Sequence, residues 1–223
     1  MESDDRIQFA IEHTKIVRRP KQKLATFGTT NVYYYLISEL MDKVNVVREG
    51  RVVASKPKIV TPAYLINLEG FSAEATRFFE LLAGKYPNES GIFYSYRNDP
   101  LEMNIVSEST DTVIDNINHI IDRQENPLTA IIKGIDEMWD VSLLKFTFDL
   151  TRSSLYRNVT EMDSKGLFRM DGSGIPEDAR INIEALFEKA REDSSYADTL
   201  ITELKRWNLF EEYQDRFLSM FKK

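Results

Sequence analysis

The chain has 223 residues, a net charge of −7 and the apolar content of a folded globular protein. It has no cysteine, which excludes disulfides, thiolate metal sites and cysteine nucleophiles and fits a reducing compartment. Its only histidines, His13 and His119, exclude a histidine-rich zinc site. The first residues are acidic and no apolar run approaches the roughly 18 residues of a membrane span, so we expect a cytoplasmic protein with no membrane partner.

Strand patterns dominate the first half of the chain. The spacing of Ile7, Ala10 and Ile11 predicts a short opening helix, and the aromatic, β-branched run 31–38 predicts a strand. Valine-rich runs on both sides of Glu49 and Gly50 predict a hairpin, because glycine accepts the positive φ of a tight turn. A short strand at 56–62, two helices between residues 62 and 84, and two strands, 91–96 and 101–106, are expected next.

From Ser109 onward the apolar residues recur at helical spacing. Ile114, Ile117 and Ile121 predict a helix that ends at Asn126 and Pro127. A long helix is predicted after it, from the spacing of Leu128, Ile132, Ile135, Trp139, Leu143, Phe146 and Leu150. Beyond a loop at 170–178, two or three further helices are predicted over 176–221.

Strands followed by helices, without βαβ alternation, predict an α+β fold with a largely antiparallel sheet in the N-terminal half and a helical C-terminal half. We expect a single domain, 1–223, made of a strand-rich half, 1–107, with two short helices and an all-helical half, 108–223. Neither GxGxxG nor GxxxxGK[ST] occurs in the sequence, so no nucleotide cofactor is expected.

Residues 13–38 form a basic stretch in an acidic chain. They include no carboxylate, and their cations are Lys15, Arg18, Arg19, Lys21 and Lys23. A polyanion would therefore meet the protein at one place and in a salt-dependent way. Tyr33 and Tyr35 of the neighbouring strand are candidates to stack on a base. This pattern favours a non-catalytic binding protein that docks on an anionic macromolecule, either RNA, including ribosomal RNA, or an acidic protein surface.

Other interpretations of the charged residues stay open. The basic stretch is also typical of a solvated connector whose charges pair with the acidic body, and of a protein–protein interaction module with no nucleic-acid role. Asp111, Asp115 and His119 step by four along one predicted helix, and Asp136 and Asp140 repeat the step on the next. If the two helices were antiparallel neighbours, these carboxylates would face each other.

Facing carboxylates of this kind are able to clamp a divalent metal ion. That arrangement would suit a carboxylate-based, metal-dependent enzyme with Arg152 as an anion clamp. The same acidic residues lie opposite the isoleucine stripe, as an ordinary solvated helix face does. The sequence leaves the oligomeric state open.

Overall fold

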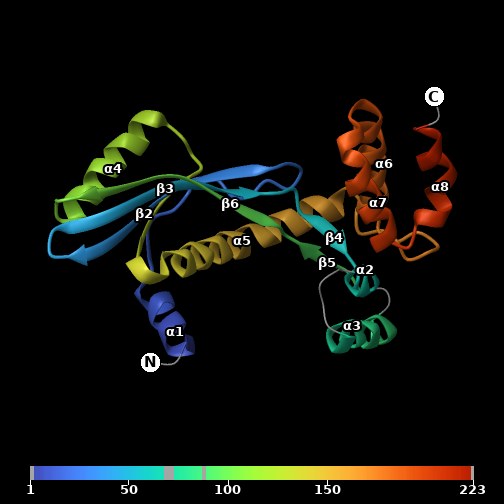
Figure 1. Cartoon of the computed structure of the whole chain (residues 1–223), viewed down its shortest axis with the longest axis horizontal. Helices are drawn as coiled ribbons and strands as arrows, with labels where there is room; N and C mark the ends of the chain where they lie inside the picture. The colour runs from blue at the N-terminus through green and yellow to red at the C-terminus, as the bar shows by residue number, and fades with distance from the viewer. Residues whose placement is uncertain (1–2, 68–72, 87–88, 222–223) are drawn as a thin grey trace. The chain divides into compact units, whose positions relative to one another are not determined.

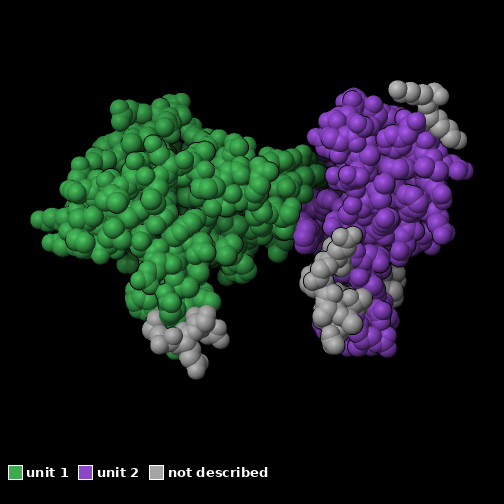
Figure 2. Space-filling model, in the orientation of Figure 1, with its two compact units in different colours: residues 1–56, 94–158 green, residues 57–93, 159–223 purple. Residues whose placement is uncertain are grey.

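The computed structural model describes residues 3–67, 73–86 and 89–221 (Figure 1). It confirms the α+β class, with a mostly antiparallel sheet in the N-terminal half and helices in the C-terminal half. The chain divides into two compact units, residues 1–56 with 94–158 and residues 57–93 with 159–223, which Figure 2 colours separately. Both predicted halves contribute to both units, so the division does not follow the boundary at residue 107.

The first unit is built on a five-stranded sheet with strand order β1-β7-β2-β3-β6. Its strands are β1 (Lys15–Arg18), β2 (Thr30–Met41), β3 (Val44–Ala54), β6 (Tyr96–Val106) and β7 (Thr129–Gly134). All neighbouring pairs are antiparallel except β2 with β7, which is parallel. The unit also contains α1 (Ser3–His13), α4 (Thr110–Gln124), the 3₁₀ turn η1 (Asp136–Met138) and α5 (Trp139–Ser164) as far as Asn158.

Helices α4 and α5 cover opposite faces of this sheet (Figure 1). Alternation along β2 explains the arrangement, because successive side chains of a strand point to opposite faces. Tyr35 and Ile37 pack with the isoleucines of α4, whereas Tyr34 and Leu36 pack with Leu143, Phe146 and Leu150 of α5. Helix α4 begins as the sequence suggests, since the Ser109 hydroxyl accepts a hydrogen bond from the Thr112 amide.

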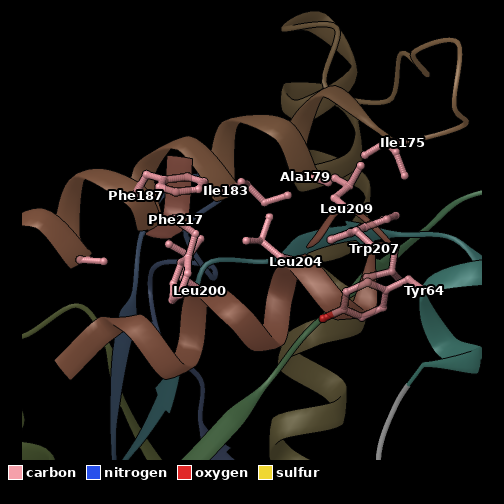
Figure 3. Close-up of a cluster of buried hydrophobic side chains, with 12 residues drawn as sticks. Tyr64, Ile175, Ala179, Ile183, Phe187, Leu200, Leu204, Trp207, Leu209 and Phe217 are labelled. Carbon is pink, nitrogen blue, oxygen red and sulfur yellow. The ribbon is translucent and has the colours of Figure 1, made fainter. Parts of the chain in front are cut away.

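The second unit is mainly helical. Its elements are β4 (Lys58–Val60), α2 (Pro62–Ile66), α3 (Ala73–Lys85), β5 (Gly91–Phe93), α6 (Glu177–Glu192), the 3₁₀ turn η2 (Ser194–Tyr196), α7 (Ala197–Arg206) and α8 (Phe210–Ser219). Its core, drawn in Figure 3, joins Tyr64 of α2 to apolar side chains of α6, α7 and α8. Two or three helices were predicted over 176–221, and the structure has three α-helices there, α6, α7 and α8.

Two strand predictions are wrong in the same way. Residues 44–54 form one continuous strand, β3, and the turn that precedes it lies at Lys43, whose φ is 59°. Gly50 has no positive φ; it sits in mid-strand beneath the Tyr34 ring. Likewise, residues 96–106 form the single strand β6, with a bulge opposite Glu49 and Gly50 in place of the expected turn.

The predicted long helix from Leu128 is also wrong at its start. Residues 129–134 form β7 in the interior of the sheet, so the second half of the chain is not all-helical. Ala130, Ile131 and Ile132 are buried on both sheet faces, which removes the alternation that identifies a half-exposed strand. The helix begins at Trp139. The sequence of α3 also predicts that Phe78, Leu81 and Leu82 face inward; Phe78 and Leu81 are instead exposed, and the Leu82 side chain lies outside the described part of the structure.

Candidate anion-binding surface

The basic segment, residues 15–23, is held to the first unit by its backbone. Strand β1 pairs with β7, and the amides of Lys21 and Gln22 both donate to the Pro127 carbonyl, at 2.8 and 3.3 Å. Just beyond the segment, the Leu24 amide donates to the Ser154 hydroxyl at 3.1 Å, and Arg157 donates to the Leu24 carbonyl at 2.7 Å. The cations therefore project from a fixed chain, not from a loose connector.

One of the five cations is bound within the unit. Arg18 donates to Asp122 at 2.6 Å and to Asn118 at 3.0 Å, both on α4. The hydrogen bond from Arg18 lowers the pKa of Asp122, and the charge of Lys21 adds to this effect. Arg18 is thus engaged in holding β1 against α4 and is the least accessible cation of the segment.

The other four cations face solvent. Lys15, Arg19, Lys21 and Lys23 are exposed, and within the described part of the chain none of them forms an ion pair with a carboxylate. The interpretation in which the acidic body neutralises the whole stretch therefore applies only to Arg18. An accessible positive surface remains.

A groove of about 220 Å³ separates the segment from α5. Its lining combines three apolar residues, Ile16, Phe146 and Leu150, with Arg19, Lys21 and Lys23 of the segment. The one carboxylate in the lining, Asp149, accepts a hydrogen bond from Lys145 at 3.2 Å, so its charge is compensated. Such a groove suits an anionic group that carries an apolar or flat portion.

The two predicted stacking tyrosines are not part of this groove. Tyr35 is only 9% exposed and belongs to the core beneath α4, so it is no stacking platform. Tyr33 is half-buried and lines a separate pocket of about 230 Å³ with Glu49 and Asn126, and no cation lines that pocket. Burial raises the pKa of Glu49, and the nearby carboxylate of Glu102 raises it further. A pocket with this chemistry does not favour phosphate.

The proposed metal ligands are not brought together. Asp111, Asp115 and His119 lie on α4, whereas Asp136 and Asp140 lie in η1 and α5 on the other side of the sheet. The predicted metal site required two antiparallel helices that face each other. The residues expected to begin the second helix instead form strand β7. Among the described residues, no group of three or more histidine, aspartate or glutamate side chains is placed to hold a metal ion.

Asp136 instead has a structural partner. It lies 2.7 Å from a guanidinium nitrogen of Arg48 in β3, and the same guanidinium stacks over the Trp139 ring at 5.4 Å. This contact fixes the start of α5 against the sheet. Arg152, considered above as an anion clamp, is exposed on α5 and does not line the groove. The sequence did not indicate that Phe146 and Leu150 of α5 line this groove, because their helical spacing predicts only that they pack in the core.

Comparison with protein families, with curated proteins and with solved structures gave no match to this chain. Among the helices described, none combines the length and apolar character needed to cross a bilayer. The geometry of the basic segment is therefore the basis of the functional proposal.

Proposed function

We propose that this protein is a non-catalytic binding protein that docks the basic segment on an anionic macromolecule, RNA or an acidic protein surface. One observation carries the proposal: Lys15, Arg19, Lys21 and Lys23 are exposed and unpaired within the described residues, on a backbone that is already ordered. The absence of cysteine from the sequence suits a reducing compartment, and we place the protein in the cytoplasm on that ground.

The fixed backbone supports this function energetically. Ordering a flexible arm at a partner opposes binding by roughly 1–2 kcal/mol per residue, and here folding has already ordered the chain. The net charge of −7 repels a polyanion elsewhere on the surface, so binding is directed to one place. Four phosphate contacts to a single strand predict about a fifty-fold loss of affinity between roughly 50 and 200 mM salt.

The test removes three of the exposed cations together, in the variant Arg19→Gln, Lys21→Gln and Lys23→Gln. A matched control, Lys43→Gln, Arg169→Gln and Lys205→Gln, changes the net charge equally at exposed positions outside the segment. Fluorescence anisotropy is measured with labelled single-stranded RNA and with a labelled polyglutamate peptide, each over a salt series.

Loss of binding in the segment variant but not in the control is the expected result, with the salt slope reduced to about a quarter. Binding of RNA alone identifies a nucleic-acid partner, and binding of the peptide alone identifies an acidic protein. Arg18→Gln should weaken binding less than Lys21→Gln, because Arg18 is engaged with Asp122. Equal loss in both triple variants, or unchanged binding in the segment variant, rejects the proposal.

A further inference from the structure

The first unit carries a second surface, apolar and separate from the basic segment. We call it the apolar surface; its residues are Leu101, Met103 and Ile105 of β6 and Leu144, Phe148 and Leu155 of α5. The first five are 61–67% exposed and Leu155 is 42% exposed. Side chains of this size are rarely left in water without a partner when they lie together.

Two strand residues of this surface, Met103 and Ile105, lie on the sheet face that α5 covers, and Leu101, at the bulge, lines the groove that Trp139 also lines. Met103 pairs with Arg48, which in turn pairs with Leu36, and Leu36 packs in the core beneath α5. Residues directly opposite one another in a sheet share a face, and so do residues two apart in one strand. Met103 and Ile105 therefore both point to the α5 side, beyond the area that the helix covers.

Helix α5 runs beside β6 over this stretch. At one end Trp139 and Met103 line the same groove of about 320 Å³, and at the other Thr151 is hydrogen-bonded to Tyr96. Leu144 and Phe148 lie between these points at helical spacing from Thr151, so they share the helix face that is turned toward β6. The exposed apolar residues of the helix and those of the strand thus lie on the same side of the sheet.

The free edge of β6 is a poor place for another strand to add. Pro100 has no amide hydrogen to donate, and the bulge beside it shifts the register between Glu49 and Gly50 of the neighbouring strand. Such features protect an edge strand from pairing. Contact with a partner is therefore expected through side chains on the α5 face, not through backbone hydrogen bonds.

The size of the patch fits an interface between two proteins. Six large apolar residues at these exposures leave roughly 100 Å² each in water, about 600 Å² together. An exposed apolar area of this size is at the upper end of the range for the largest patch on a monomeric protein. It is also most of the roughly 800 Å² that each partner buries in a stable complex. A polar rim would supply the rest.

The charges that flank the helix residues identify the partner. Asp140, Leu144, Phe148 and Arg152 form one ridge of α5 at steps of four, and both charged ends are exposed. If two such ridges cross about a two-fold axis between Leu144 and Phe148, each Leu144 meets the other copy's Phe148. The same symmetry places each Asp140 opposite the other copy's Arg152, so the ridge is complementary to itself.

We infer that this chain forms a two-fold symmetric dimer through the apolar surface, with the α5 ridge of one copy packed against the same ridge of the second. Helices that pack through their steps of four cross at about −50°, the commonest class in globular proteins. The basic segment lies on the opposite flank of α5, where Asp149 and Ser153 line its groove, so dimerisation leaves the segment accessible in both copies.

Sedimentation velocity over a concentration series tests the inference. The wild-type chain should sediment at twice the monomer mass of 25.9 kDa, and Phe148→Glu should sediment at the monomer mass. Ile181→Glu, at a half-exposed apolar position on α6, is the control and should remain dimeric. Circular dichroism spectra and melting curves identify any variant that fails to fold, and Leu144→Glu then replaces Phe148→Glu.

The charged ends of the ridge give a sharper test. Asp140→Arg and Arg152→Asp should each weaken the dimer by roughly tenfold or more, because each creates two like-charge contacts about the axis. Mixing the two single variants should restore dimers, since both contacts in the mixed dimer are again between opposite charges. A wild type that stays monomeric, a dimer that Phe148→Glu leaves intact, or a mixture that does not recover affinity each overturns the inference.

Discussion

Replacing Gly50 by alanine should destabilise the first unit strongly. An ideal Cβ at this position would lie 2.6 Å from Cζ of Tyr34 and in still closer contact with its hydroxyl oxygen. Ordinary carbon contacts need about 3.5–4.0 Å, so the ring must move by about 1 Å. Tyr34 is fully buried in the α5 core, and its hydroxyl donates to Asn98 at 3.0 Å, so there is little room for this movement.

Two terms give the size of the effect. Overpacking a well-packed core destabilises by about 1–3 kcal/mol, and a weakened hydrogen bond to Asn98 adds about 1 kcal/mol. We therefore expect Gly50→Ala to lower the unfolding free energy of the first unit by about 3 kcal/mol. Hydrogen–deuterium exchange reports this locally, as a roughly hundredfold faster exchange of the most protected β2 and β3 amides.

Two comparisons decide whether the steric reasoning holds. Gly28→Ala is the control, because a Cβ at Gly28 would meet no atom within 4 Å, and it should change stability by less than about 1 kcal/mol. In a Tyr34→Leu background, which lacks the two closest atoms and leaves the Asp99 carbonyl oxygen at 3.0 Å, Gly50→Ala should likewise have an effect below about 1 kcal/mol. An equal loss in both backgrounds, or wild-type exchange in the single variant, would refute the close approach as the reason for glycine.

Two further predictions concern the second unit. Asp178 is completely buried and accepts hydrogen bonds from the Ile59 amide and the Asn182 side chain, both at 3.0 Å. Asp178→Ala leaves that amide without its acceptor and should destabilise the unit by about 2–3 kcal/mol in urea unfolding, while Asp178→Asn, which keeps an oxygen, should lose less. Burial, and then the charge of Glu203, raises the pKa of Tyr64 to about 12. Since the unfolded tyrosine ionises near its ordinary value of 10, stability should fall as pH rises from 10 to 12, by up to about 2–3 kcal/mol. Tyr64→Phe should abolish this part of the pH dependence, and a wild-type curve that stays flat above pH 10 would contradict it.

Local signals were sufficient for some elements of the fold. The aromatic and β-branched run that became β2, the onset of helical spacing at Ser109 and the helical character of 176–221 were each evident from a few neighbouring residues. Strand β7 was not evident. Its side chains are buried by α4 on one face and by α5 on the other, and that double burial depends on β1 and β2, about a hundred residues earlier.

The basic segment shows the same division between local and distant information. Charge counting located it, because five cations without a carboxylate form a signal in the sequence itself. The charge count does not show which cations remain accessible. Arg18 is bound by Asn118 and Asp122, which lie on a helix about a hundred residues further along the chain. Gly50 is similar: its neighbour in space is Tyr34, and the sequence alone favoured a turn.

The apolar surface was missed because its pattern is the pattern of a core. Leu101, Met103 and Ile105 alternate as the buried face of any half-exposed strand does, and only the topology reveals that β6 is an edge that α5 leaves uncovered. The sequence of helix α5 also does not show which apolar residues are buried. One apolar stripe packs on the sheet, and a second, which contains Leu144 and Phe148, is exposed to solvent. A helix that packs on a single core needs only one stripe. The second therefore requires its own partner, and the opposite charges at its two ends favour another copy of the same helix.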